Sequence, residues 1–328
     1  ARGMGKCCVS GAGAINVDYK TRTVEIEGIT LKEGDFISLN GTTGEVYKGK
    51  VETKAAEVSG DFAALMDLCN KYTKLNVRTN ADTPHDAEVA RAFGASGIGL
   101  CRTEHMFFDA EKIVAMREMI LSPDVEGRRK ALAKLLPFQK ADFKGIFKAM
   151  DGCPVNVRLL DPPLHEFVPH DAKGQEEMAK AMGVTVQEIK KRVESLCEHN
   201  PMLGHRGCRL GNTYPEITEM QTQAILGAAI ELKKEGYDPH PEIMVPLTGI
   251  LYEFEAQEKV IRDAAAALFE KEGMEIPFKV GTMIEIPRAA LTANRIASRA
   301  EYFSFGTNDL TQMTFGYSRD DIASFLPV

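Results

Sequence analysis

The alternation of short apolar runs with helical stretches is the feature that most limits how this chain can fold. Segments with helical spacing separate the strand-like runs, which lie at residues 74–80, 97–104, 153–161, 242–247, 278–286 and 302–309. A strand followed by a helix, repeated about six times, predicts a parallel sheet covered by helices. A doubly wound open sheet and a closed (β/α)8 barrel of the TIM type share this local pattern.

The positions of the polar residues favour the barrel. Polar side chains stand at or just beyond the carboxyl ends of at least four runs, and they are Arg102, Arg158 with Asp161, Glu285, and Asn308 with Asp309. All strands of a barrel open on one face, so these groups would converge on one mouth. An open sheet would gather them only near its switch point. We therefore predict an α/β fold with a TIM-type barrel over residues 56–328.

The first 55 residues have a different texture. Val24 and Ile26 alternate with charged neighbours, and glycines punctuate the segment every few residues. This pattern predicts a small β-rich unit. Because the chain begins with Ala1 and not with Met, we expect it to be a fragment of a longer polypeptide. Residues 1–55 would then be the end of a domain that begins upstream.

Charge and composition narrow the classes of partner. The 328 residues carry a formal net charge of -7, which argues against nucleic acid and against an anionic membrane surface as partners. No apolar run approaches the roughly 18 residues of a membrane span. The seven cysteines form no CxxC pair, which favours packed thiols in a reducing compartment.

Two acids end consecutive apolar strands and suggest a metal site. Glu285 and Asp309 would lie on adjacent strand ends, and two carboxylates with open positions suit a hard divalent cation, most plausibly Mg2+. The alternative is that each acid caps the helix that follows it.

Arginines end two of the earlier strands and suggest an anion site. The planar fork of an arginine grips carboxylate or phosphate, so Arg102 and Arg158 facing a metal would suit a small phosphorylated acid. The alternative is a pair of structural salt bridges, for instance Arg102 with Glu104. The glycine-rich segment 200–211 carries Arg206 and Arg209, which would form a second basic wall or belong to a tight connection.

Six separated segments carry a family resemblance: residues 97–108, 157–167, 200–211, 242–247, 280–291 and 302–321. Together they resemble the pyruvate, phosphate dikinase family of the PEP-utilising enzymes. The resemblance implies a barrel that binds pyruvate or phosphoenolpyruvate (PEP). Matched position by position, it makes Arg102 and Arg158 ligands of PEP and makes Glu285 and Asp309 ligands of Mg2+. It also implies that Gly306, Thr307 and Asn308 line the substrate.

The resemblance further implies a reaction shared between domains. ATP, pyruvate and phosphate would become AMP, PEP and diphosphate through a phosphohistidine domain and an ATP-grasp domain of the same polypeptide. Residues 1–55 would be the end of the swivelling phosphohistidine domain. The phosphohistidine would precede Ala1, and the eighth barrel strand, with a proton-donating cysteine, would follow Val328. No catalytic residue is then expected in this chain, which alone should not turn over.

Other expectations follow from the same resemblance, and three alternative functions stay open. A homodimer formed through the barrel is expected, in the cytoplasm or in an organelle. The alternatives are phosphoenolpyruvate synthase, enzyme I of the sugar phosphotransferase system, and a binding module without catalysis.

Overall fold

The computed structural model describes residues 7–26, 28–52, 60–198, 200–319, 321–322 and 325–326. The chain divides into two compact units, Ala1–Leu75 and Asn76–Val328. This division groups the helix before Leu75 with the β-rich segment. The domain identities inferred from the sequence, with a boundary after residue 55, stay predictions.

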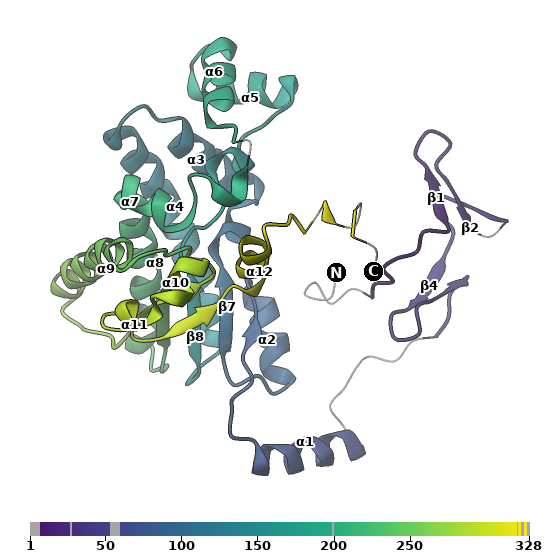
Figure 1. Cartoon of the computed structure of the whole chain (residues 1–328), viewed down its shortest axis with the longest axis horizontal. Helices are drawn as coiled ribbons and strands as arrows, with labels where there is room; N and C mark the ends of the chain where they lie inside the picture. Colours follow the sequence, from purple (N-terminus) through teal and green to yellow (C-terminus); the bar gives the residue numbers. More distant parts are fainter. Residues whose placement is uncertain are drawn as a thin grey trace. The chain divides into compact units, whose positions relative to one another are not determined.

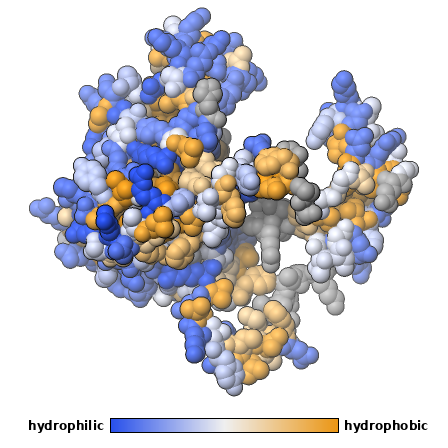
Figure 2. Space-filling view, viewed as in Figure 1, coloured by the Kyte–Doolittle hydropathy of each residue, from blue (hydrophilic) through white to orange (hydrophobic). Residues whose placement is uncertain are grey.

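The first unit is built from short antiparallel strands and one helix. Strands β1 to β3 form one sheet, and β4 and β5 form a hairpin; their bounds are Ile15–Asp18, Thr23–Ile26, Ile29–Lys32, Ile37–Asn40 and Glu45–Lys48. Helix α1 (Gly60–Tyr72) buries none of its residues. Its apolar side chains, including Phe62 and Leu65, are therefore open to solvent, and they form the orange patch on this helix in Figure 2.

The second unit is organised around one parallel sheet (Figure 1). Its six strands are β6 (Thr79–Asn80), β7 (Ile98–Arg102), β8 (Pro154–Arg158), β9 (His240–Val245), β10 (Lys279–Ile284) and β11 (Phe303–Phe305). Each strand lies beside the strand that precedes it in the sequence. A doubly wound sheet would reverse its order at a switch point, and these six strands show no reversal. The sheet is curled into a half-barrel, so the barrel-like alternative describes the fold.

Helices follow the strands and cover one face of the sheet. The longer ones are α2 (Pro84–Ala92), α3 (Ala110–Leu121), α4 (Val125–Ala149), α8 (Pro215–Lys234), α9 (Leu251–Glu272) and α12 (Thr307–Phe315). The shorter α10 (Pro287–Leu291) and α11 (Ala293–Ile296) lie between β10 and β11. At the start of α2 the Thr83 hydroxyl accepts the Asp86 amide at 3.1 Å, with Pro84 at the first turn. Threonine at the N-cap and proline at the first helical position are typical of a helix start.

An insertion between β8 and α8 extends the second unit. It contains α5 (Ala172–Met182), α6 (Val186–Leu196) and α7 (Gly207–Thr213). The single-turn helices are η2 (Thr103–Phe107) after β7, and η3 (Leu164–Phe167) and η4 (Pro201–Leu203) within the insertion. A second apolar cluster joins the insertion to α3 and α4 through residues such as Phe107, Met119, Leu132, Phe167 and Ile189.

The main core lies between the sheet and the helices. Val155 and Val157 of β8 pack with Phe143, Phe147 and Phe254 of the surrounding helices. Because side chains alternate along a strand, Asn156 and Arg158 point to the opposite, concave face. At β8 the concave face is therefore polar. Among the described residues, no helix is long and apolar enough to cross a membrane.

Candidate functional site

The carboxyl ends of the strands carry the predicted site residues. Arg102 and Arg158 are register partners at the ends of β7 and β8. Glu285 follows β10 directly, and Gly306 follows β11. Asp309 lies in the first turn of α12. Parallel pairing brings these ends to one edge of the sheet, as the sequence predicted.

A chain of alternating charges connects these strand ends. Arg158 donates through Nη2 to Glu104, which lies in η2, and its Nη1 lies 2.9 Å from Asp161 Oδ2. Arg206, just before α7, contacts Asp161 through Nη2 at 2.6 Å and through Nε at 3.2 Å. The same Nη2 lies 3.2 Å from Oδ2 of Asp309. The network thus ties β8, α7 and α12 into one charged surface.

The two arginines at register positions have different surroundings. Arg158 is only 9% exposed, and its flanking acids keep its pKa above the ordinary arginine value although burial opposes this. The Arg102 side chain is half-buried, and it has no ion-pair partner among the residues that the structure describes. The alternative pairing of Arg102 with Glu104 is wrong, because Glu104 pairs with Arg158.

Glu285 is the most deeply buried acid of the site, with 1% exposure. Its Oε1 accepts the backbone amide of Leu247 at 2.7 Å. Leu247 has a φ of 61°, a rare conformation for a residue with a side chain, which holds its N–H toward the carboxylate. Burial, followed by the charge of Asp161, raises the pKa of Glu285 to about 8; Arg158 opposes the rise and Asp309 adds to it.

Gly306 leaves the space that the Glu285 carboxylate occupies. A Cβ atom at Gly306 would overlap the Oε2 atom of Glu285. Thr307 and Asn308 follow at the exposed start of α12. They line an open cavity of about 490 Å³ together with Phe315 and Tyr317. Neither Glu285 nor Asp309 caps a helix through a side-chain hydrogen bond, since α10 and α12 have none at their first turn.

The two carboxylates would supply only part of the ligand shell of a cation. Within the described ranges, no group of three or more His, Cys, Asp or Glu side chains is placed to hold a metal ion. Mg2+ commonly binds through one or two carboxylates and completes its shell with water and ligand oxygens. Glu285 and Asp309 would supply two such carboxylates, and the charge of Asp309 acts to raise the pKa of Glu285.

Several residues of the site were not assigned to the ligand or the metal from the sequence. Asp161 was named there as a polar strand end, Arg206 as part of a possible basic wall, and Glu104 as a possible partner of Arg102. The Leu247 amide had no signal in the sequence. Gly207 has a φ of 56°, and a Cβ atom added there would lie 2.6 Å from Cβ of Leu247. Arg209 points elsewhere and donates to the Gly204 carbonyl at 2.9 Å.

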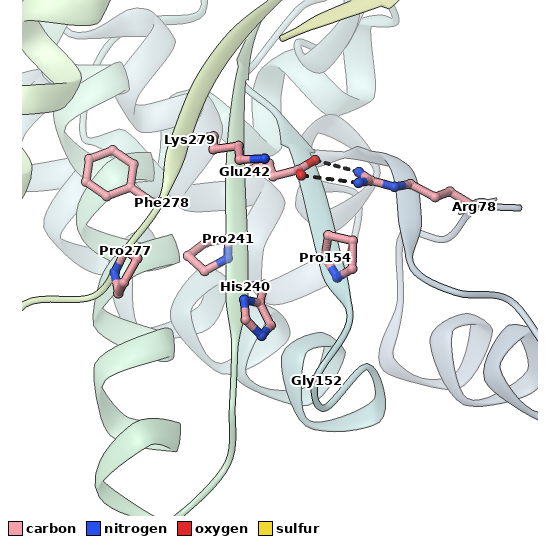
Figure 3. Close-up of a pocket in the computed structure, with 9 residues that line it drawn as sticks. All are labelled: Arg78, Gly152, Pro154, His240, Pro241, Glu242, Pro277, Phe278 and Lys279. Carbon is pink, nitrogen blue, oxygen red and sulfur yellow. Dashed lines mark hydrogen bonds and ion pairs between the residues drawn. The ribbon is translucent and has the colours of Figure 1, made fainter. Parts of the chain in front are cut away.

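The opposite edge of the sheet has its own cavity, of about 510 Å³ (Figure 3). Pro154, His240 and Lys279, the first residues of β8, β9 and β10, line it. Arg78 pairs there with Glu242 of β9, with Nη1 2.6 Å from Oε2. None of the predicted site residues is in the lining of this cavity, so the cavity is distinct from the site at the carboxyl ends of the strands.

The half-barrel carries acids and arginines at its strand ends, and comparison with known proteins identifies its family. The family model described as "PEP-utilising enzyme, PEP-binding domain" matches residues 56–325. The chain belongs to this family.

Particular relatives are the pyruvate, phosphate dikinases. The chain is similar to that of Clostridium symbiosum, with 57% identity over 327 residues covering 99% of the chain and 37% of the relative. The dikinase of Giardia intestinalis is 58% identical over 327 residues, covering 100% of the chain and 37% of the relative. Pyruvate, phosphate dikinase 1, chloroplastic, of Oryza sativa subsp. japonica is 55% identical over 331 residues, covering 100% and 35%. The chain thus spans little more than a third of these proteins.

Proposed function

We propose that this chain is the part of a pyruvate, phosphate dikinase that binds pyruvate and PEP. The observation that carries the proposal is the meeting of Glu285 and Asp309 with Arg158 and Arg206 at one end of the sheet. Acids on one side and arginines on the other suit a small anion bound beside a cation. The identity of the relatives favours the dikinase over phosphoenolpyruvate synthase, enzyme I and a non-catalytic module.

The arginines have different roles in this proposal. Arg102, whose guanidinium has no ion-pair partner within the described ranges, binds the phosphoryl group or the carboxylate of the ligand and offsets its charge. Arg158 is held in place by Glu104 and Asp161, so it offers its remaining N–H groups in a fixed direction. Gly306, Thr307 and Asn308 line the ligand, and the start of α12 presents backbone amides to its oxygens.

Glu285 and Asp309 would hold Mg2+. The bound ion would supply positive charge to the carboxylate and enolate oxygens of the ligand. The Leu247 amide keeps the Glu285 carboxylate facing the site, and the space at Gly306 admits it. Burial raises the pKa of Glu285 by disfavouring the ionised carboxylate, and a cation bound beside it would stabilise that ionised form.

The whole reaction needs further domains, and the relatives are long enough to contain them. We propose that the six strands belong to a closed (β/α)8 barrel, and that residues 1–55 end a swivelling phosphohistidine domain. Phosphoryl transfer would run between that histidine and the bound ligand, with ATP handled by an ATP-grasp domain of the same polypeptide. The product set would be AMP, PEP and diphosphate. We further propose a homodimer in the cytoplasm or an organelle; the relative from Oryza sativa subsp. japonica described above is named chloroplastic.

Calorimetric titration with oxalate, a flat dianion that mimics the enolate of pyruvate, tests the proposed site. We expect oxalate to bind the chain in the presence of Mg2+, to bind far more weakly with a chelator, and to lose the Mg2+ effect in Glu285→Gln. Asp263→Asn is the matched control, since Asp263 is exposed on α9 and pairs with Lys259. Mg2+-dependent binding that persists in a folded Glu285→Gln chain would contradict the proposed metal site.

A further inference from the structure

Arg206 divides its guanidinium between two acids. It grips Asp161 with two nitrogen atoms, at 2.6 and 3.2 Å. Its contact with Asp309 is single and longer, 3.2 Å from Nη2 to Oδ2. Asp161 is 3% exposed, whereas the Asp309 side chain is 19% exposed. The Asp161 contact is therefore the anchor, and the Asp309 contact is the one that can open.

We propose that Arg206 is the counter-ion of Asp309 when no metal is bound, and that a divalent cation must replace it. This inference rests on the proposed function, which makes Asp309 a ligand of Mg2+. A cation at Asp309 and the guanidinium of Arg206 compete for one carboxylate and repel each other. Arg206 therefore lowers the affinity of the site for a metal alone.

The exchange also supplies a donor to the anionic ligand. Because Nε and Nη2 of Arg206 stay bound to Asp161, the side chain need not leave the site when Asp309 takes up the cation. The N–H group of Nη2 that is released from Asp309 is then available to an anion. Metal binding and anion binding are in this way coupled, with the metal favouring the anion.

Titration with Mn2+ alone, followed by electron paramagnetic resonance, measures the competition directly. Arg206→Gln should bind Mn2+ more tightly than the unchanged chain, by about five-fold or more, the lower range of coupling between sites. Arg209→Gln is the matched control, because Arg209 lies three residues further on and bonds the Gly204 carbonyl instead. Its Mn2+ affinity should equal that of the unchanged chain. Equal or weaker Mn2+ binding by a folded Arg206→Gln chain would overturn the inference.

A measurement on the unchanged chain decides the matter if Arg206→Gln fails to fold. The guanidinium Nε–H resonance of Arg206 in a nitrogen-15 spectrum should shift at saturating Mg2+, and that of Arg209 should not. An Arg206 signal that Mg2+ leaves unmoved would also overturn the inference.

Asp309→Asn separates this inference from the function on which it rests. The proposed function requires that Asp309→Asn bind Mn2+ much more weakly than the unchanged chain. If Mn2+ affinity is unaffected by Asp309→Asn, the metal site itself is wrong. If Asp309→Asn loses the metal while Arg206→Gln gains nothing, the metal site stands and only the competition is refuted.

Discussion

At the scale of single residues, Arg102 and Arg158 are expected to differ in how much each contributes to the stability of the fold. They occupy equivalent register positions, but only Arg158 is buried between two acids. Removing one partner of a buried ion pair leaves an uncompensated charge, whereas removing Arg102, which pairs with no acid in the part of the chain that the structure describes, leaves none. Arginine is therefore expected to contribute strongly to stability at the end of β8 and weakly at the end of β7.

Arg158→Gln should lower the free energy of unfolding by about 3–5 kcal/mol, because Glu104 and Asp161 lose their buried partner. Arg102→Gln should lower it by less than about 1 kcal/mol while weakening oxalate binding. Urea unfolding and oxalate titration of both variants check the contrast. If both variants lose the same free energy of unfolding, then breaking the buried ion pairs of Arg158 destabilises the fold no more than removing Arg102 does.

Glu285 predicts a pH dependence of stability for the metal-free chain. The folded-state pKa of about 8 lies above the ordinary glutamate value of 4.5, so the folded chain binds the proton more tightly. The stability from this group is complete below pH 4.5 and is lost as the pH rises through 8. Between pH 6 and pH 9 the chain should lose about 2–3 kcal/mol more than Glu285→Gln does.

Urea unfolding in a chelating buffer at the two pH values measures this difference, since other groups titrate alike in both chains. Parallel pH profiles for the unchanged chain and Glu285→Gln would show that Glu285 is ionised throughout.

At the scale of elements, the helix starts and strand ends set both stability and site geometry. Thr83→Ala should cost about 1 kcal/mol of unfolding free energy, because the Asp86 amide loses its hydroxyl acceptor at the start of α2. Thr83→Ser, which keeps the hydroxyl, should be close to the unchanged chain. The urea midpoints of the two variants decide, and a Ser variant as unstable as the Ala variant would assign the loss to the methyl group.

Gly306 joins the end of β11 to the site, and Gly306→Ala should disturb it. The added Cβ would displace the Glu285 carboxylate, so Mg2+-dependent oxalate affinity should fall about ten-fold or more, equivalent to about 1.4 kcal/mol. Gly227→Ala in α8 is the control, because its Cβ would meet only the flexible end of the Lys140 side chain of α4. Calorimetry on both variants checks this, and equal oxalate affinities would place the ligand away from Glu285.

The elements differ in how far the sequence could predict them. Alternating runs located β8 and β10 well, because their apolar residues face a helix-covered core. The run at residues 74–80 gave only the two-residue β6, since Leu75 and Val77 are 81% and 73% exposed and bury nothing. The strand-end positions of Arg158 and Glu285 were also visible in the sequence.

The pairings within the site were not visible in the sequence. Glu104 lies two positions from Arg102, yet it pairs with Arg158 across the sheet edge. That choice depends on which strand ends face each other and on burial, which no local pattern states. The Leu247 amide is a backbone group in a rare conformation, and its role follows only from the three-dimensional turn after β9.

At the scale of the whole molecule, all candidate site residues belong to one compact unit. Arg102, Arg158, Glu285 and Asp309 lie within Asn76–Val328. A chain of residues 76–328 should therefore bind oxalate with Mg2+ as tightly as the full chain does. Circular dichroism would first establish that the shorter chain is folded, and calorimetry would then compare the affinities. A weaker affinity in a folded shorter chain would assign part of the site to residues 1–75.

The strictly sequential order of β6 to β11 has a consequence for how the second unit assembles during synthesis. Every new strand finds its partner in the strand made just before it, so no strand has to wait for one that comes later in the sequence, although the segment between β8 and β9 is long. The sheet can then grow at one edge as the chain emerges. Glu285 and Asp309 arrive with the last two strands of this series. The ligand site is thus completed only after the scaffold that supports it has formed.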